Sequence, residues 1–232
     1  MSHAPSSSSS TLARSTFASS LRRRHVAAPR DVSARRTPPR RAVTTSAHTA
    51  EQLKTLKMTT TKLRECAKRG AASTAVDLLV GLGAQGVTPD ATCATACISA
   101  CVNGANMELA QKVYDEIFEK GVCVPDEVAV AEIAKGYLQL DPPGWGRAMQ
   151  LVNGARQKYG VEPSSVTYNV LLSTCAATND LMRAEEIVDR MVDEDVPADG
   201  YTLKAVEKRR SIRAYVRKML LVDKEEVWDD DE

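Results

Sequence analysis

Histidine is scarce in this chain, and its placement bears directly on the question of catalysis. The three histidines, His3, His25 and His48, all lie within the first 50 residues. The rest of the sequence therefore offers no histidine for Ser-His or Cys-His catalysis or for a histidine-ligated zinc site. It also shows no phosphate-binding loop and no dinucleotide fingerprint. We expect a protein that is not an enzyme and that needs no cofactor.

Aromatic residues and long apolar runs are also lacking. Aromatics make up 4% of the chain, which leaves little material for the stacking platforms that single-strand binders often use. No apolar run is long enough for a secretory or transmembrane segment, so no membrane insertion is expected. The apolar residues that remain suit helix-on-helix packing.

The first 50 residues have a composition of their own. They contain nine arginines, eleven serines, no lysine and a single acid, Asp31. A segment rich in arginine and serine but poor in acids is typical of an organelle transit peptide. We interpret residues 1–50 as a disordered transit peptide, with the serine run Ser6–Ser10 favouring a plastid over a mitochondrion. The alternative is a disordered basic tail that binds nucleic acid.

A transit peptide is removed after import, so we expect residues 1–50 to be absent from the mature protein. Sequencing of the N-terminus of organelle-purified protein should find a start between roughly Ala42 and Glu51. Recovery of intact Met1 from the compartment would contradict this interpretation.

Charge is nearly balanced over residues 51–222, which hold 21 basic and 22 acidic residues. The acidic tail, residues 223–232, adds seven acids and one lysine. Such a body does not support nonspecific binding to polyanions, so any contact with RNA must depend on local patches.

Small residues and prolines recur along the body at nearly constant spacing. Ala75, Ala110, Ala148 and Ala184 are separated by 35, 38 and 36 residues, and a proline follows each at a similar distance. This period predicts a stack of helical hairpins. The units are 56–90, 91–126, 127–164 (degenerate) and 165–199, then a partial repeat or capping helix at 200–222 and the acidic tail at 223–232. Asn179-Asp180 is a helix-start signal within the fourth unit, and Gly86 and Gly121 suit the ends of second helices.

The fourth unit carries the clearest motif, Val166-Thr167-Tyr168-Asn169, followed by Ala184, Met191 and Asp199. The first and second units end in Pro89-Asp90 and Pro125-Asp126. These residues resemble the pentatricopeptide repeat family over roughly residues 56–222. The tetratricopeptide repeat, a protein-binding hairpin of about 34 residues, fits the Thr-Tyr-Asn start and the Pro-Asp ends less well. The resemblance implies an all-α, right-handed solenoid of about four hairpins with a C-terminal capping helix.

The resemblance also implies a ligand. Proteins of this family bind single-stranded RNA at about one base per repeat, and the base is chosen mainly by the fifth and last residues of each repeat. Those pairs are Thr60 with Asp90, Thr95 with Asp126, Ala131 with Ser164, and Asn169 with Asp199. The implied word, 5′ to 3′, is guanine, guanine, unknown, uracil. Asn169 and the aspartates also suit helix caps, and the two roles can hold at once.

One dense basic segment, Lys204–Lys218, lies in the body. We expect it to contact phosphates through Lys204, Lys208, Arg209, Arg210, Arg213 and Arg217. Lys218 belongs to the same segment. The alternative is the solvated outer face of a capping helix that packs through Ile212, Tyr215 and Val216. The acidic tail either folds back on this segment or only aids solubility.

The cysteines are the remaining candidates for chemistry. Cys93, Cys97 and Cys101 share one helical face, but their spacing matches no common zinc or iron–sulfur pattern. Cys66, Cys101 and Cys175 each occupy the eleventh position of their units, where Tyr137 stands in the third unit. That register favours a buried packing role for free thiols, and no metal is expected.

These observations predict an organellar RNA-binding protein that acts by occupancy in RNA processing, stability or translation. A word of about four bases is too short to address one transcript, so a protein partner is expected to supply further specificity or activity. No catalytic domain is expected after the repeats. The alternative is a protein-interaction scaffold, either an assembly factor or a subunit of an organellar complex, which the near-neutral body and the degenerate third unit favour.

Overall fold

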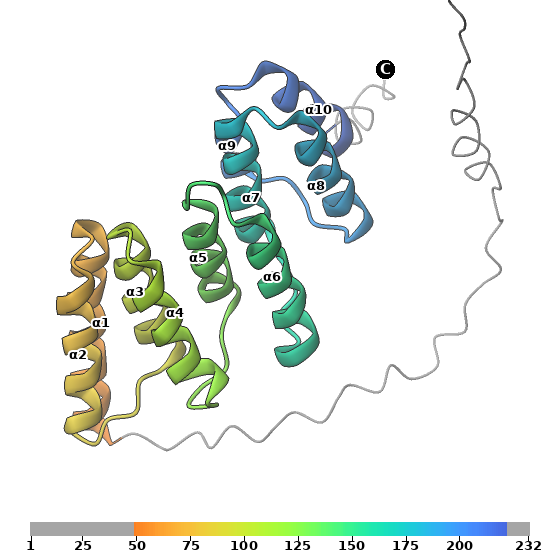
Figure 1. The fold of residues 1–232 in the computed structure, drawn as a ribbon. Coiled ribbons are helices and arrows are strands. Elements are labelled where there is room, and N and C mark those ends of the chain that lie inside the picture. Colours follow the sequence, from red (N-terminus) through yellow and green to blue (C-terminus); the bar gives the residue numbers. More distant parts are fainter. Residues whose placement is uncertain (1–48, 222–232) are drawn as a thin grey trace, which may run out of the picture. The chain divides into compact units, whose positions relative to one another are not determined.

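The computed structural model describes residues 49–221, which form helices and no strand. The predicted transit peptide, apart from its last two residues, and the acidic tail lie outside these residues. The helices alternate along the chain as hairpins (Figure 1). They are α1 (Ala50–Arg69), α2 (Ala72–Ala84), α3 (Ala91–Asn103), α4 (Met107–Tyr114) continued by the π-helical turn η1 (Asp115–Glu119), α5 (Glu127–Leu138), α6 (Trp145–Tyr159), α7 (Ser165–Thr178), α8 (Leu181–Asp193), α9 (Gly200–Ala205) and α10 (Arg210–Leu220).

The first helix of each hairpin packs on the first helix of the next. The contacts run from α1 to α3, α5, α7 and α9 in turn, and we call this array the first-helix layer. Helices α1, α3, α5 and α7 also pack on the second helices of their own hairpins, which are α2, α4, α6 and α8. The predicted all-α solenoid of helical hairpins is therefore confirmed.

The recurring alanines explain how the two helices of a hairpin approach one another. Ala75, Ala110 and Ala148 are each 0% exposed, and Ala184 is 1% exposed. A larger side chain at any of these positions would need its neighbours to move, because protein interiors are close-packed.

Helix α5 joins the two halves of the core. Ala129 and Ile133 lie in an apolar cluster with α1 to α4, whereas Val130, Ala134 and Leu138 lie in a second cluster with α6 to α10. The degenerate third unit thus contributes to both clusters, although its sequence matches the repeat poorly.

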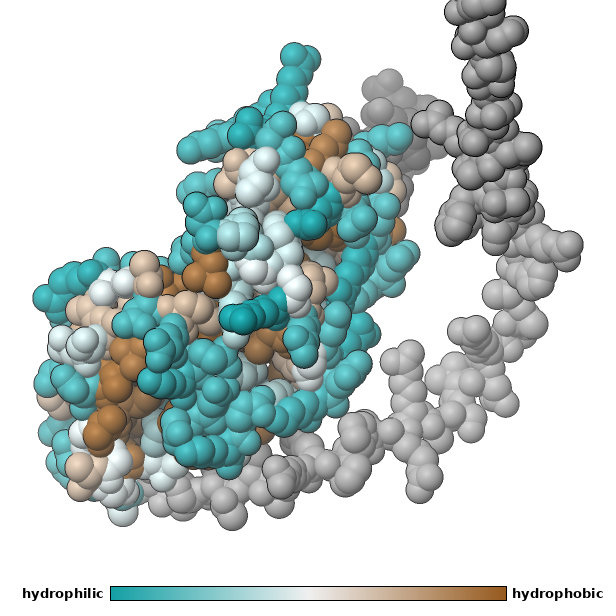
Figure 2. Space-filling view, in the orientation of Figure 1, coloured by the Kyte–Doolittle hydropathy of each residue, from teal (hydrophilic) through white to brown (hydrophobic). Residues whose placement is uncertain are grey.

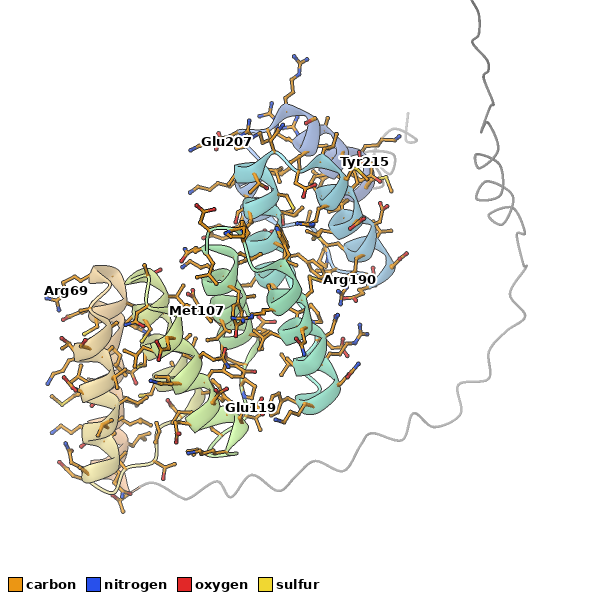
Figure 3. All side chains as sticks on the ribbon, viewed as in Figure 1. Arg69, Met107, Glu119, Arg190, Glu207 and Tyr215 are labelled. Atoms are coloured by element: carbon orange, nitrogen blue, oxygen red, sulfur yellow. The ribbon has the colours of Figure 1, made fainter. Side chains whose placement is uncertain are left out.

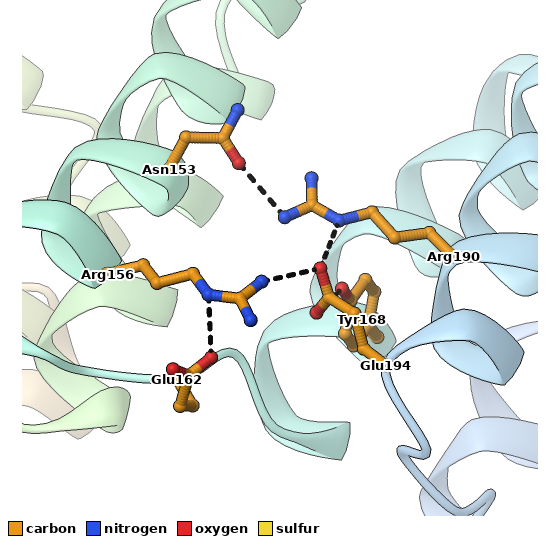
Figure 4. Close-up of polar contacts among 6 residues, drawn as sticks. All are labelled: Asn153, Arg156, Glu162, Tyr168, Arg190 and Glu194. Atoms are coloured by element: carbon orange, nitrogen blue, oxygen red, sulfur yellow. Dashed lines mark hydrogen bonds and ion pairs between the residues drawn. The ribbon is translucent and has the colours of Figure 1, made fainter. Parts of the chain in front are cut away.

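Polar contacts fasten α6 to α8 across the third and fourth units (Figure 4). Arg190 of α8 donates to Asn153 of α6, and Arg156 of α6 pairs with Glu194 at the end of α8. Glu194 also accepts from the Tyr168 hydroxyl at 2.5 Å. Burial alone would raise the pKa of Glu194, but the hydrogen bonds from Tyr168 and Arg190 and the nearby arginines hold that pKa below its usual value.

The sequence predicted a partial repeat or a capping helix over residues 200–222. Two helices, α9 and α10, form there, because the chain turns between Val206 and Arg209. Val206 is 0% exposed, which holds the turn against the core. Helix α10 packs on α8 through Ile212 and Val216. The hydroxyl of Tyr215, which Figure 3 labels on α10, donates to Asp189 of α8 at 2.7 Å.

The cysteines of the described residues are free, and five of them are buried. Cys66, Cys101 and Cys175 are 3%, 0% and 0% exposed, as their shared repeat position predicted, whereas Tyr137 in the same position is only half-buried. Tyr137 departs from the prediction because its hydroxyl reaches outward to donate to Gln111 at 2.6 Å.

Burial should make these thiols unreactive in the folded protein. It raises the pKa of Cys93 to about 11 and that of Cys175 to about 12. Since the thiolate is the nucleophile, we expect a thiol reagent at neutral pH to label Cys93 and Cys175 slowly in native protein and fast in denaturant. Metal analysis under reducing conditions should find no bound soft metal. Rapid native labelling of both thiols, or one metal ion per chain, would contradict the packing role.

Candidate nucleic-acid interface

The last residue of each repeat caps the first helix that follows it. Asp90, Asp126 and Asp199 accept a hydrogen bond from the backbone N–H three residues on, at 2.8, 2.7 and 2.7 Å. Ser164 accepts from the N–H of Val166 at 3.3 Å. The caps satisfy N–H groups that a helix start would otherwise leave unpaired. They also place four side chains at equivalent ends of α3, α5, α7 and α9.

The fourth repeat brings its two predicted residues together. The amide nitrogen of Asn169, on α7, donates to Asp199 Oδ1 at 3.0 Å. The other carboxylate oxygen of Asp199 accepts from Ser165 at 3.1 Å. Turning the amide over would set its oxygen against the carboxylate, so electrostatics fix its orientation. The second N–H of the amide is not used by Asp199.

Asp199 is fully engaged within the protein. Its Oδ1 accepts from the backbone N–H and the hydroxyl of Thr202, in addition to Asn169. Burial works to raise the pKa of Asp199, but the hydrogen bonds from Asn169, Thr202 and Ser165 outweigh it and lower that pKa. A carboxylate held in this way orients Asn169 and leaves the second N–H of its amide for a ligand. The amide oxygen is buried and has no hydrogen-bond partner among the described residues.

The other predicted pairs differ from one another. Thr95 donates to Asp126 at 3.3 Å, which repeats the arrangement of the fourth unit. The Thr60 hydroxyl instead donates to the Leu56 carbonyl at 2.8 Å and lies 2.9 Å from the Cys93 sulfur. Among the hydrogen bonds of residues 49–221, none joins Thr60 to Asp90.

The third pair offers little polar chemistry. Ala131 is 2% exposed and has no polar side-chain atom, and Ser164 serves as the cap of α7. Among residues 49–221, hydrogen bonds therefore join the predicted pairs of the second and fourth units and not those of the first and third.

A groove of about 480 Å³ lies over the Asn169–Asp199 pair, between α5, α7 and α9. Its volume falls in the range of about 300–1,000 Å³ that is usual for ligand sites. Its lining residues are Lys135, Gln139, Val166, Asn169, Val170, Ser173, Thr174, Asp199 and Tyr201.

Several of these residues were missed from the sequence. Val166 and Ser173 stand three residues before and four after Asn169, so helical periodicity alone places them on its face. Tyr201 is 73% exposed and gives the groove an aromatic wall. Lys135 brings a cation, and its ammonium group donates to Asn103 at 2.9 Å. Lys135 is half-buried and also pairs with Glu132 at 3.4 Å. No sequence signal distinguishes it from the other lysines of the body, because the α3–α5 contact positions it.

The basic segment separates into exposed and engaged side chains. Arg209 is half-buried and donates to the carbonyls of Ala176 and Ala177 at 2.6 and 3.4 Å, which closes the end of α7. Arg213 donates to the Glu207 carbonyl at 3.4 Å. The exposed members are Lys204, Lys208, Arg210, Arg217 and Lys218, and we call these five the cationic surface. Hydrophilic side chains crowd this end of the molecule in Figure 2.

Two further features of residues 49–221 bear on the kind of site present. No group of three histidine, cysteine, aspartate or glutamate side chains is placed to hold a metal ion. None of the helices is long and apolar enough to cross a membrane.

The helical hairpins stack through the first-helix layer, and the Asn169–Asp199 pair lies at the surface of that layer. This architecture defines a helical-repeat protein. The family model described as "Pentatricopeptide repeat domain" matches residues 153–197, and the model described as "PPR repeat" matches residues 92–122. The chain therefore contains pentatricopeptide repeats in these two segments.

Its relatives are longer. A chloroplastic pentatricopeptide repeat-containing protein of Arabidopsis thaliana is 32% identical over 95 residues, which is 40% of this chain and 11% of the relative. The solved structure of the pentatricopeptide repeat protein PPR10 with an 18-nt psaJ RNA element matches with a TM-score of 0.57 at 19% identity. The match covers 71% of this chain and 26% of PPR10. PPR10 from maize matches with a TM-score of 0.51 at 18% identity, over 71% of this chain and 25% of that one.

Proposed function

We propose that the protein binds single-stranded RNA along the first-helix layer. The observation that carries the proposal is the Asn169–Asp199 pair at the floor of the groove. An amide held in one orientation can donate to a base edge, which is how single-stranded RNA is distinguished by sequence. Tyr201 offers a face on which a base can stack, and Lys135 offers a cation. PPR10, whose fold this chain shares, was solved with RNA.

The base preference of each repeat depends on whether the last residue of the repeat holds the fifth residue by a hydrogen bond. The fourth repeat is expected to select uracil through Asn169, and the second to select guanine through Thr95, which Asp126 holds in the same way. Thr60 lacks that support because its hydroxyl bonds to its own helix. The third repeat contributes spacing and no base contact.

We infer that the protein acts by occupying RNA in its processing, stability or translation. A plastid is the proposed compartment, on the composition of residues 1–50 and the chloroplastic relative. Because a recognition sequence of about four bases is so short, we expect a protein partner to supply further specificity. A pure scaffold role is the competing proposal. Helix α2 supports binding of a protein partner, because Asp77 is its only charged residue and its apolar Val80 is 67% exposed.

Titration of short single-stranded RNAs at several salt concentrations tests the proposal. RNA binding predicts measurable affinity that falls as salt rises, with oligomers carrying the implied word bound most tightly. Absence of any salt-sensitive affinity for single-stranded RNA, together with capture of a protein partner that persists after nuclease treatment, would leave the scaffold role instead.

A further inference from the structure

Within the described residues, acidic side chains do not balance the positive charge of the cationic surface. The segment 200–221 contains seven basic residues and one acid, Glu207. None of the nine ion pairs of residues 49–221 includes a residue of this segment. Helices α4, α5, α6 and α8, by contrast, each hold at least one lysine or arginine in an ion pair.

The sequence that follows has the opposite charge. Residues 222–232 carry seven acids and one lysine, so their net charge of −6 equals in size the +6 of residues 200–221. They also contain Val227 and Trp228 between two groups of acids. Two adjacent segments of equal and opposite charge attract each other at short range, and the covalent link keeps their effective concentration high.

The lengths of the two segments are compatible. Helix α10 has 11 residues, which corresponds to about 16 Å. Residues 222–232, if extended, can span up to about 36 Å from the end of that helix. The acids can therefore run back along α10 from Lys218 to Arg210 and reach the lysines near α9.

We propose that residues 222–232 lie on the cationic surface in the free protein and that RNA phosphates must displace them. Exposed ion pairs are individually weak, so several of them form an association that a polyanion can replace. The second half of this inference depends on the proposed RNA binding, whereas the first half does not.

Competition of this kind acts on one part of the binding energy. Phosphate contacts carry no base information, and the tail weakens only those contacts. The hydrogen bond from Asn169 to a base then supplies a larger share of the binding free energy. The tail therefore weakens binding to unrelated RNA more than it weakens the preference for the correct base.

Zero-length carbodiimide crosslinking of the full chain without RNA tests the first half, because it joins carboxylates only to amines in contact. We expect intramolecular links from the acids of residues 223–232 to Lys204, Lys208 and Lys218, which high salt abolishes by screening. The matched control is the other basic helix, α1, which exposes Lys54, Lys57, Lys62 and Lys68. Links to α1 at equal yield, or no links to either helix, would overturn the docking.

Neutralisation of the tail tests the second half. A variant with all seven acids of residues 223–232 changed to their amides should bind an oligouridine probe about tenfold more tightly at low salt. The slope of log affinity against log salt should steepen by about 0.7 for each cation released. Unchanged affinity and slope, with the crosslinks present, would overturn the competition. If neither protein binds RNA, the proposed function fails, while the crosslinks still decide whether the tail docks.

Discussion

Single-stranded RNA binding should fall by up to about 100-fold at physiological salt when Lys204, Lys208, Arg210 and Arg217 are all changed to glutamine. These side chains are exposed and take part in no ion pair of residues 49–221, so each can pair with a phosphate once the acids of residues 222–232 are displaced. The loss should be equal for all RNA sequences, because phosphates are the same in each.

The salt dependence separates this effect from a general loss of folding. In the chain whose seven tail acids are changed to amides, removal of four phosphate contacts should flatten the slope of log affinity against log salt by about 3. In the wild-type chain, whose tail competes for the same cations, the flattening should be smaller. Lys112→Gln with Lys120→Gln is the control, since both lysines are exposed but paired with glutamates of their own helix. An equal loss in the control, or a loss confined to one RNA sequence, would contradict the assignment of this surface.

Arg209 is left out of that variant for a structural reason. Its guanidinium closes the end of α7 through the carbonyls of Ala176 and Ala177, and it lies between α9 and α10. Replacement of Arg209 would leave those carbonyls without a donor and loosen the last hairpin. A weaker RNA affinity would then report folding as well as phosphate contact.

Gly104→Ala should destabilise the protein by about 1–3 kcal/mol. Gly104 ends α3, and a Cβ added there would lie 2.5 Å from the Gly70 carbonyl oxygen at the end of α1. Backbone cannot turn aside as a side chain can, so α1 and α3 would have to separate. Asn103 also donates to the Ala67 carbonyl at 2.9 Å, and that bond would be strained.

Gly83→Ala provides the matched control for this prediction. Gly83 lies in α2, and a Cβ added there would have nothing within 4 Å. Alanine at such a helical position should stabilise by about 0.5–1 kcal/mol. Urea unfolding followed by circular dichroism measures both. If both variants change the free energy of unfolding in the same direction, the close approach of α1 and α3 is not the reason that position 104 requires glycine.

The hairpins and their caps could be predicted from the sequence because they depend on local features. The aspartates at the repeat ends cap the helices that follow them, and Asp180 caps α8 after Asn179, as the sequence indicated. The recurring alanines mark buried positions because any repeat of this kind needs a small residue there.

Other features depended on neighbours that the sequence does not place. The turn of Thr60 toward Leu56 and Cys93 reflects the local packing of α1 on α3. The sequence does not distinguish Arg209 from the other arginines of its segment, because its role depends on the end of α7 that lies beside it. The groove required α5, α7 and α9 to pack in order, and with it came Lys135 and Tyr201.

Base selection by Asn169 is the central claim, and one measurement tests it most directly. The affinities of wild type and Asn169→Ala are compared for RNAs that differ only at the base opposite the fourth repeat. Wild type should prefer uracil there, and the variant should lose that preference by about 1 kcal/mol, or roughly fivefold. The quadruple glutamine variant should keep the preference despite its lower affinity. An identical order of bases in wild type and Asn169→Ala would contradict the account.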